Sequence, residues 1–324
     1  MKRLLSIAIS LVILALIYWK IDLNGLAEVF RDCDRRWMAI SLSMVIPITA
    51  ITSWRLQQLA PPQAKLGFGE ANRLILAASS LNMVLPSKMG DIAKAYFMRD
   101  RGHLSGTLAL SLVVFEKTCD MLSLLLWCVF GLTLYGQKDT VFWIMTFCIF
   151  AGLVLGSLML VSPQFAHRFF GAAEAIAPKK IRPKLAKMKA SWQDMHAYFW
   201  RDRDQLLRIT SVSIFIWFLH LLQIWFFILA LKAWAPFLAN LALSPLAILA
   251  GLLPLTFAGV GTRDAALILF YQPYFDATTG AALGLLCTSR YFIPAIGGIP
   301  FLGKYLTSLK NMKQETPVPP RPTQ

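Results

Sequence analysis

The sequence predicts an all-α polytopic membrane protein with about six transmembrane helices and two re-entrant helical hairpins. Hydrophobic residues make up 57% and charged residues 15% of the 324 residues, which is too apolar for a typical soluble chain. The net charge of +15 is concentrated in a few loops between apolar runs. This distribution serves positive-inside topology and anionic lipid head groups, so we expect no nucleic-acid partner.

Two apolar segments are interrupted in the same way. The first reads Leu-Pro-Ser-Lys-Met-Gly-Asp over 85–91, and the second reads Leu-Pro-Leu-Thr-Phe-Ala-Gly-Val-Gly-Thr-Arg-Asp over 253–264. Backbone groups freed by Pro and Gly cannot face lipid, so they must be buried in protein or line a wet cavity. A matched pair of interrupted segments in the two halves of a membrane protein indicates a transporter's substrate site.

The first half of the chain contains four apolar runs of spanning length and one short pair of helices. The predicted spans are 4–19, 37–54, 104–135 and 141–161. No small-residue cleavage site follows the first run, which favours an uncleaved span over a signal peptide. The run 74–85 is too short to cross a bilayer, and a second short helix over 92–98 follows its break. These two short helices form the first predicted hairpin, at about 71–100.

The basic loop at 162–208 fixes the predicted orientation. Its many Lys and Arg residues outnumber its acids, so it is expected in the cytoplasm together with the N-terminus. Part of it mixes Lys with Trp, Tyr and Phe, which predicts an amphipathic helix on the cytoplasmic surface. With this orientation the first hairpin must enter from the cytoplasm and return to it.

The second half repeats this arrangement upside down. Spans at 209–231 and 280–303 flank a second predicted hairpin at about 241–275, which enters from the outside. The two halves then form an inverted repeat within a single membrane domain over 1–310, from which alternating access follows. A Pro-rich tail at 311–324 is predicted to be a disordered cytoplasmic segment. The alternative is six to eight plain spans with ordinary kinks, because Gly and Pro are common in membrane helices.

Ionisable residues are predicted inside the membrane. Glu116 and Asp120 lie one turn apart on one face of the span 104–135, with Glu116 about 18 Å along the helix. Carboxylates at that depth need a counter-charge or a proton, and Arg290 and Arg263 are the candidate partners. These residues either form a structural ion-pair network or belong to a site for a charged head group, and the two roles are compatible.

The two breaks carry further candidate residues. In the first break, Lys88 precedes Gly90 and Asp91, where a short helix begins and its N-terminal amides suit a phosphate. Lys88 and Lys94 are alternatively cytoplasmic anchors that obey the positive-inside rule. In the second break, Gly259 and Gly261 allow backbone to approach a ligand. The residues assigned to binding in the two breaks are Pro86, Lys88, Gly90, Asp91, Pro254, Gly259, Gly261, Arg263 and Asp264.

These motifs resemble those of the lysylphosphatidylglycerol synthase transmembrane (flippase-like) family, over roughly residues 5–305. The matching positions are Leu85, Pro86, Gly90, Asp91, Glu116, Asp120, Pro254, Gly259, Gly261, Arg263, Asp264 and Arg290. Lys117 departs from the family's more frequent Arg and loses bidentate geometry. The chain shows no soluble aminoacyltransferase domain, so lysyl transfer is not expected of it.

The resemblance implies translocation of a lipid across the cytoplasmic membrane of a prokaryotic cell. The expected cargo is a lipid with a charged head group, such as an aminoacylated phospholipid or a polyprenyl-phosphate-linked sugar. The chain is therefore predicted to be a flippase or lipid transporter, with Lys117 in its binding site beside the residues above. No catalytic residue, metal or cofactor is expected. The alternatives are a membrane-embedded lipid-modifying transferase, in which Glu116 or Asp120 would act as a base, and an accessory subunit of such an enzyme.

Overall fold

The computed structural model describes residues 23–60, 65–84, 90–91, 94–95, 98–99, 106–134, 138, 140–178, 182–200, 202–252 and 261–314. All regular structure within these ranges is helical, which confirms the predicted all-α class. The predicted first span at 4–19 lies outside the described residues, as do most residues of the two breaks.

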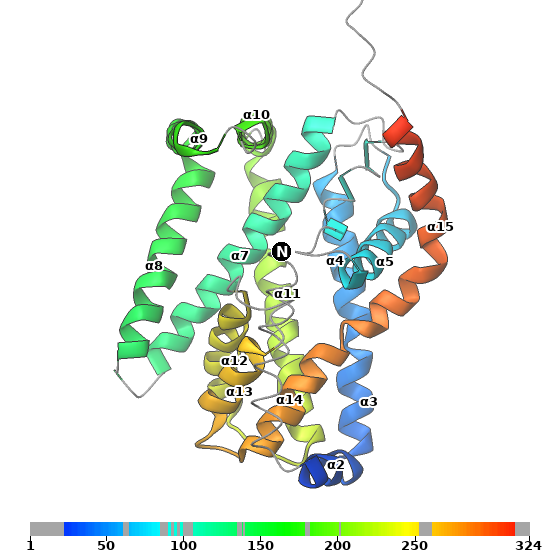
Figure 1. Cartoon of the computed structure of the whole chain (residues 1–324), viewed down its shortest axis with the longest axis vertical. Coiled ribbons are helices and arrows are strands. Elements are labelled where there is room, and N and C mark those ends of the chain that lie inside the picture. Colours follow the sequence, from blue (N-terminus) through cyan, green and yellow to red (C-terminus); the bar gives the residue numbers. More distant parts are fainter. Residues whose placement is uncertain are drawn as a thin grey trace, which may run out of the picture.

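The helices follow one another in a simple order (Figure 1). They are α2 (Leu23–Arg31), α3 (Arg35–Ser43), α4 (Val45–Leu59), α5 (Phe68–Val84), α7 (Gly106–Leu134), α8 (Thr140–Val161), α9 (Pro163–Ile176), α10 (Arg182–Phe199), α11 (Arg203–Ala230), α12 (Phe237–Leu252), α13 (Thr262–Tyr271), α14 (Ala277–Ser289) and α15 (Phe292–Gln314).

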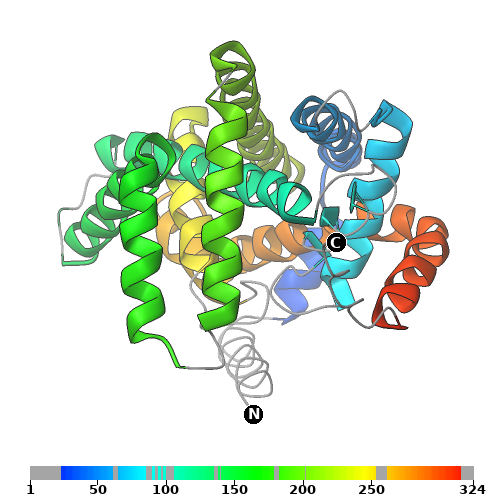
Figure 2. The same ribbon diagram turned by 90° about the horizontal axis from the view of Figure 1, so that it is seen from above.

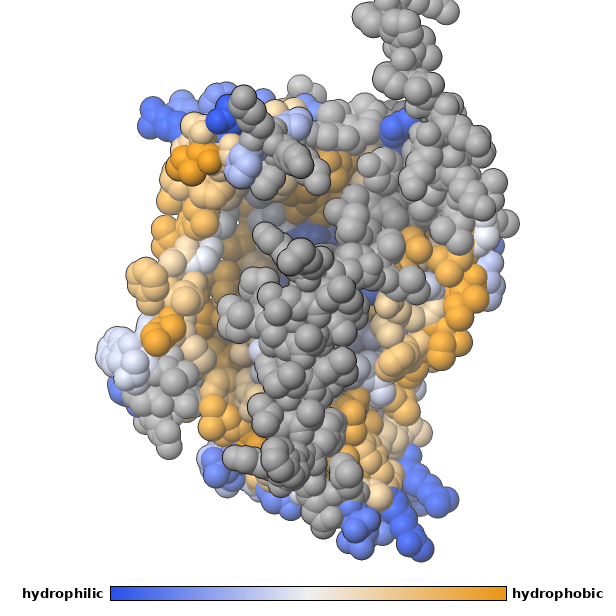
Figure 3. Space-filling model, viewed as in Figure 1, coloured by the Kyte–Doolittle hydropathy of each residue, from blue (hydrophilic) through white to orange (hydrophobic). Residues whose placement is uncertain are grey.

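Four helical segments of the described chain are long and apolar enough to cross a membrane. They are Arg35–Leu59, Phe142–Val161, Arg203–Ala230 and Ala277–Gly303. Figure 3 shows apolar side chains along both flanks of the molecule, between two polar ends. A belt of this kind matches the hydrocarbon layer of a bilayer, and the protein is a multi-pass membrane protein.

Two predicted spans differ from the structure in ways that affect the site. The second span continues through α4 to Leu59, five residues beyond the predicted end at Trp54. The last span, predicted as one helix over 280–303, is formed by α14 and α15 with a break at Arg290 and Tyr291. Helix α15 also runs to Gln314, so the helix continues into the segment predicted as a disordered tail.

Helices α12 and α13 are short and pack against each other. They contain 16 and 10 residues, about 24 Å and 15 Å of helix, and both are shorter than the roughly 30 Å hydrocarbon layer. Figure 1 shows both in the half of the molecule that lies away from α9 and α10. The second predicted break, at 253–264, covers the connection between these two helices and the first residues of α13.

The two halves of the chain exchange close helix contacts. Helix α5 packs on α15, and α12 packs on α7. Each contact includes a glycine against the facing backbone: a Cβ at Gly298 would lie 2.0 Å from the Leu76 carbonyl oxygen, and one at Gly131 would lie 2.3 Å from the Ala242 carbonyl oxygen. Small residues let membrane helices approach to backbone contact, so both crossings depend on the missing side chain.

Helices α9 and α10 lie side by side across one end of the bundle (Figure 2). Trp192 of α10 and Trp200, which directly follows this helix, donate their indole N–H groups to the carbonyls of Met159 and Leu160, at 2.9 Å each. These carbonyls belong to the last turn of α8, where Pro163 supplies no N–H to continue the ladder. The predicted surface helix is therefore joined to α8 by side-chain capping.

Helix α10 also contacts the interior of the bundle. Its Phe199 ring stacks on Phe115 of α7, with ring centroids 3.8 Å apart. Both rings belong to a buried apolar cluster that contains residues of α4, α5, α7 and α10, while a second cluster lies around α11 to α14. Phe115 directly precedes Glu116 in α7, so the first cluster lies beside the charged residues described next.

Candidate substrate site: a buried charged cluster

Glu116 and Asp120 lie on one face of α7 and share one arginine, Arg55 of α4. The Arg55 Nη2 atom lies 3.0 Å from Glu116 Oε1, and its Nη1 atom donates to Asp120 Oδ1. Arg55 Nη1 also donates to Ser213 Oγ of α11 at 2.8 Å. Three helices therefore meet at a single guanidinium, whose fixed geometry suits two carboxylates at once.

Two lysines complete the arrangement. Lys94 Nζ lies 2.7 Å from Glu116 Oε2 and 3.2 Å from Asp91 Oδ1. Lys117 Nζ lies 3.2 Å from Asp91 Oδ2 and 3.5 Å from Asp120 Oδ2. Asp91 ends the first break and Lys94 follows it, so this part of the predicted hairpin is tied to α7 by ion pairs. Gly90, predicted at the same break, is buried, and a Cβ there would lie 2.3 Å from the Ala78 carbonyl oxygen of α5.

We call these six residues the charged cluster: Arg55, Asp91, Lys94, Glu116, Lys117 and Asp120. It contains three cations and three carboxylates, so its formal charge is balanced. Arg55, Lys94 and Glu116 are 1–2% exposed, whereas the side chains of Lys117 and Asp120 are 44% and 21% exposed. The cluster thus has a closed side and an open side, and the open side is where a ligand could reach charge.

Sequence reasoning missed Arg55 and left Lys94 open as a membrane anchor. Arg55 was missed because the second span was predicted to end at Trp54, which placed the arginine in a loop. In the structure α4 continues past it by four residues and buries it. An Arg within one turn of an apolar run, followed by two glutamines, was the available signal.

The second break holds a separate ion pair. Arg263 Nη2 lies 2.6 Å from Asp264 Oδ1 and also donates to Thr288 Oγ1 at 2.6 Å and to the Gly284 carbonyl at 3.1 Å. Asp264 Oδ2 accepts from the backbone N–H of Gly261, where φ is 101°, a conformation that favours glycine. Arg263 therefore joins the start of α13 to α14, and it does not pair with the carboxylates of α7.

Arg290 lies at the break between α14 and α15 and is 4% exposed. Its Nη1 atom lies 3.4 Å from Gln223 Oε1 of α11, and its Nη2 atom lies 3.1 Å from the Tyr291 hydroxyl. No carboxylate among the described residues lies within ion-pair distance of it. The expected pairing of Arg290 with Glu116 or Asp120 is therefore wrong for this structure, because Arg55 and the two lysines occupy those carboxylates.

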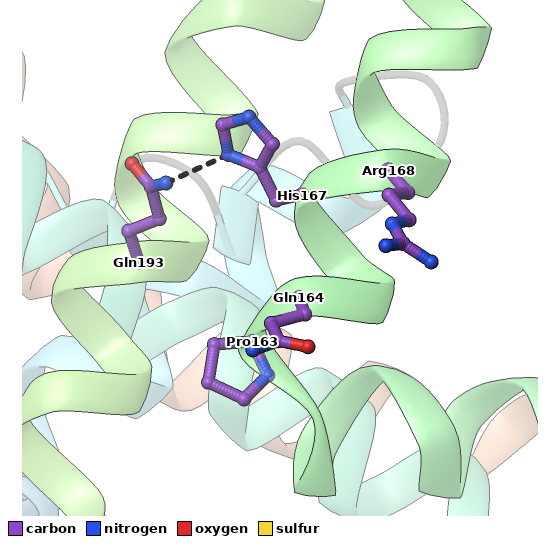
Figure 4. Close-up of a pocket in the computed structure, with 5 residues that line it drawn as sticks. All are labelled: Pro163, Gln164, His167, Arg168 and Gln193. Atoms are coloured by element: carbon purple, nitrogen blue, oxygen red, sulfur yellow. Dashed lines mark hydrogen bonds between the residues drawn. The ribbon is translucent and has the colours of Figure 1, made fainter.

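Four residues predicted for the site lie outside the described residues: Pro86, Lys88, Pro254 and Gly259. The described residues contain no group of His, Cys, Asp and Glu side chains that could hold a metal. A pocket of about 360 Å³ lies between α9 and α10, lined by Pro163, Gln164, His167, Arg168 and Gln193 (Figure 4). His167 and Gln193 are hydrogen-bonded at 3.0 Å and Arg168 points away from them, so the lining does not converge on one ligand group.

Comparison with protein-family models gives a match over most of the chain. A search of curated proteins found no match to the chain. A family model described as the lysylphosphatidylglycerol synthase TM region matches residues 3–298, nearly the whole chain. Membership in this family indicates a function related to membrane lipids. The chain therefore belongs to the family of lysylphosphatidylglycerol synthase transmembrane regions.

Proposed function

We propose that the protein is a lipid flippase that moves a lipid with a charged head group across the bilayer by alternating access. One observation carries this proposal: a cluster of six ionised side chains lies within an apolar helical bundle, with an open side at Lys117 and Asp120. Ionisable residues inside membrane segments are costly, and they mark substrate or ion pathways more often than other positions.

Stability alone is a weak reason to keep such a cluster. Apolar residues of similar volume usually stabilise a protein as well as a buried ion pair does. Lys117 contacts both Asp91 and Asp120, so it can give up one carboxylate and keep the other. Apolar packing provides no such exchangeable charged contact for a ligand. A charged head group can replace one partner while the rest of the cluster keeps its balance.

We also propose that the bundle is an inverted repeat with two re-entrant hairpins and about six spans. The supporting observations are the short pair α12 and α13, and the exchanged contacts of α5 with α15 and of α12 with α7. Two copies of one unit, related by an axis in the membrane plane, would make this exchange. The basic helices α9 and α10 would then face the cytoplasm of the cell, as would both termini.

We propose no catalytic step for the chain. Glu116 and Asp120 are each held by two or more cations, so neither carboxylate is available as a general base in this arrangement. A transferase or an accessory role remains an outcome of the test rather than part of the proposal.

Reconstitution into liposomes tests this function. Fluorescent phospholipids in the inner leaflet should become accessible to a membrane-impermeant quencher at least severalfold faster than in protein-free liposomes. Lys117→Gln should reduce that rate, and Lys232→Gln, an exposed site outside the cluster, should not. Labelled lipid that stays in its leaflet beside folded protein would overturn the proposal. A change in lipid mass would instead indicate an enzyme, and neither effect would indicate an accessory subunit.

A further inference from the structure

Arg290 is a buried cation for which the described residues provide no carboxylate. Among the described residues its guanidinium contacts neutral groups, the amide of Gln223 and the ring and hydroxyl of Tyr291. Its Nε atom is buried and has no hydrogen-bond partner. A buried guanidinium with an unused donor is expensive unless an anion reaches it in part of the working cycle.

The neighbouring backbone adds a second feature that suits an anion. Helix α15 begins at Phe292, two residues after Arg290, and the N–H groups of Phe292 and Ile293 precede its first helical hydrogen bond, which Ala295 donates to the Tyr291 carbonyl. Arg290 is also the C-cap residue of α14, so the positive end of α15 and the negative end of α14 both lie at this break. Asp264, the carboxylate at the start of α13, offers Arg290 no compensation because it is already paired with Arg263.

Helix α11 gives the distance between this region and the charged cluster. Ser213 of α11 contacts Arg55, and Gln223 of the same helix contacts Arg290. Ten residues of helix separate them, about 15 Å along the axis. Helix α11 begins at Arg203, shortly after α10, and reaches Ser213 before Gln223. Arg290, which contacts Gln223, is therefore farther from the α9–α10 end than the charged cluster.

We propose that Arg290 binds the phosphate of a phosphate-bearing lipid, at a station separate from the charged cluster and farther from the α9–α10 end. This proposal rests on the flippase function and narrows its cargo to lipids that carry a phosphate. A planar guanidinium beside a helix start binds phosphate oxygens through two N–H groups, which a lysine cannot do. The charged cluster, with its balanced formal charge, would receive the rest of the head group.

Binding by the purified full-length protein tests the station. Phosphatidylglycerol is compared with diacylglycerol of the same chains, which lacks the phosphate, and lipid retention is measured by native mass spectrometry. Arg290→Gln should weaken retention of phosphatidylglycerol at least tenfold and leave diacylglycerol unchanged. Arg36→Gln, at an exposed arginine of α3, is the matched control and should change neither. Equal retention of phosphatidylglycerol by wild type and Arg290→Gln would overturn the proposal.

Thermal unfolding of the lipid-free protein separates binding from a structural role. If Arg290 is kept for a ligand, Arg290→Gln should unfold at the same temperature as wild type or higher, because an uncompensated buried charge is removed. A fall of several degrees would assign Arg290 to the fold and overturn the proposal. If Arg290→Gln does not fold, Arg290→Lys decides: it should keep the unfolding temperature and lose several-fold in phosphatidylglycerol retention, and unchanged retention contradicts the station.

Two further measurements distinguish a lipid phosphate from a free phosphate ester, and test the binding station and the flippase function separately. Displacement of retained lipid by millimolar glycerol phosphate would assign the station to free phosphate esters, and resistance to it would assign the station to lipid. Retention that depends on Arg290, without leaflet exchange in liposomes, would sustain the station and reject the flippase. Leaflet exchange that is indifferent to Arg290→Gln would sustain the flippase and reject the station.

Discussion

The charged cluster and the region around Arg290 differ in whether the buried cations have carboxylate partners. In the cluster every cation contacts two carboxylates, and Arg55 also donates to Ser213. Around Arg290 the described neighbours are neutral. The comparison shows that burial alone does not define a functional charge. Removing one member of a compensated cluster destabilises the fold, because its partner is left buried and unpaired. An uncompensated buried charge is costly by itself, and binding an anionic ligand would lower that cost.

The largest effect should come from removing the shared cation. Arg55→Met would leave Glu116 and Asp120 with fewer counter-charges in a buried place, and it should cost about 3–5 kcal/mol of stability. Denaturant or thermal unfolding of the purified protein measures this cost. Arg36→Met at an exposed position is the control. An Arg55→Met protein as stable as wild type would mean that the cluster is not a structural unit, and the contrast with Arg290 would disappear.

Substitutions at the two glycine crossings should cause the next largest loss of stability. They also test whether the two crossings are equivalent, as the proposed inverted repeat requires. Gly298→Ala and Gly131→Ala would each place a Cβ within 2.3 Å of a carbonyl oxygen of the facing helix. Overpacking of this kind costs about 1–3 kcal/mol. Gly69→Ala in α5 has open space around it and should be neutral or slightly stabilising. Unfolding curves that rank one crossing far above the other would argue against their equivalence.

The capping of α8 predicts a smaller loss. Trp192→Phe keeps an aromatic ring, though a smaller one, and removes the N–H that satisfies the Met159 carbonyl, which Pro163 cannot do. Leaving that acceptor unsatisfied should cost about 1–2 kcal/mol. Trp143→Phe, at a ring that faces outward from α8, provides the comparison in the same unfolding assay. Equal stability of the two variants would show that water reaches the end of α8.

The smallest effect on stability is expected at the open side of the cluster. Lys117 is 44% exposed, so Lys117→Gln should change stability by less than about 1 kcal/mol. The same variant should nonetheless slow lipid exchange in the liposome assay, because it removes the cation that can change partners. Loss of stability with unchanged exchange would reverse the roles assigned to the two sides of the cluster.

Much of the fold and part of the site follow from the sequence. Hydropathy and charge located α8 and the end of α11 within one residue, although α11 begins six residues before the predicted span, and helical spacing correctly put Glu116 and Asp120 on one face of α7. The partners of these carboxylates were not predictable in the same way. Which cation reaches a buried carboxylate depends on how helices far apart in the chain cross, and Arg55 comes from a span whose end was placed one turn too early. Likewise, local sequence did not indicate that the last span breaks at Arg290.

Helix α11 is a single uninterrupted element of 28 residues that contacts both arginines, through Ser213 and Gln223. A screw motion of this helix would withdraw the hydroxyl from one guanidinium and the amide from the other in the same step. A change in the contacts of Arg55 would then be coupled to a change in the contacts of Arg290 through the rigid helix itself. In such a protein, the rotation of α11 would set the times at which a head group binds and is released.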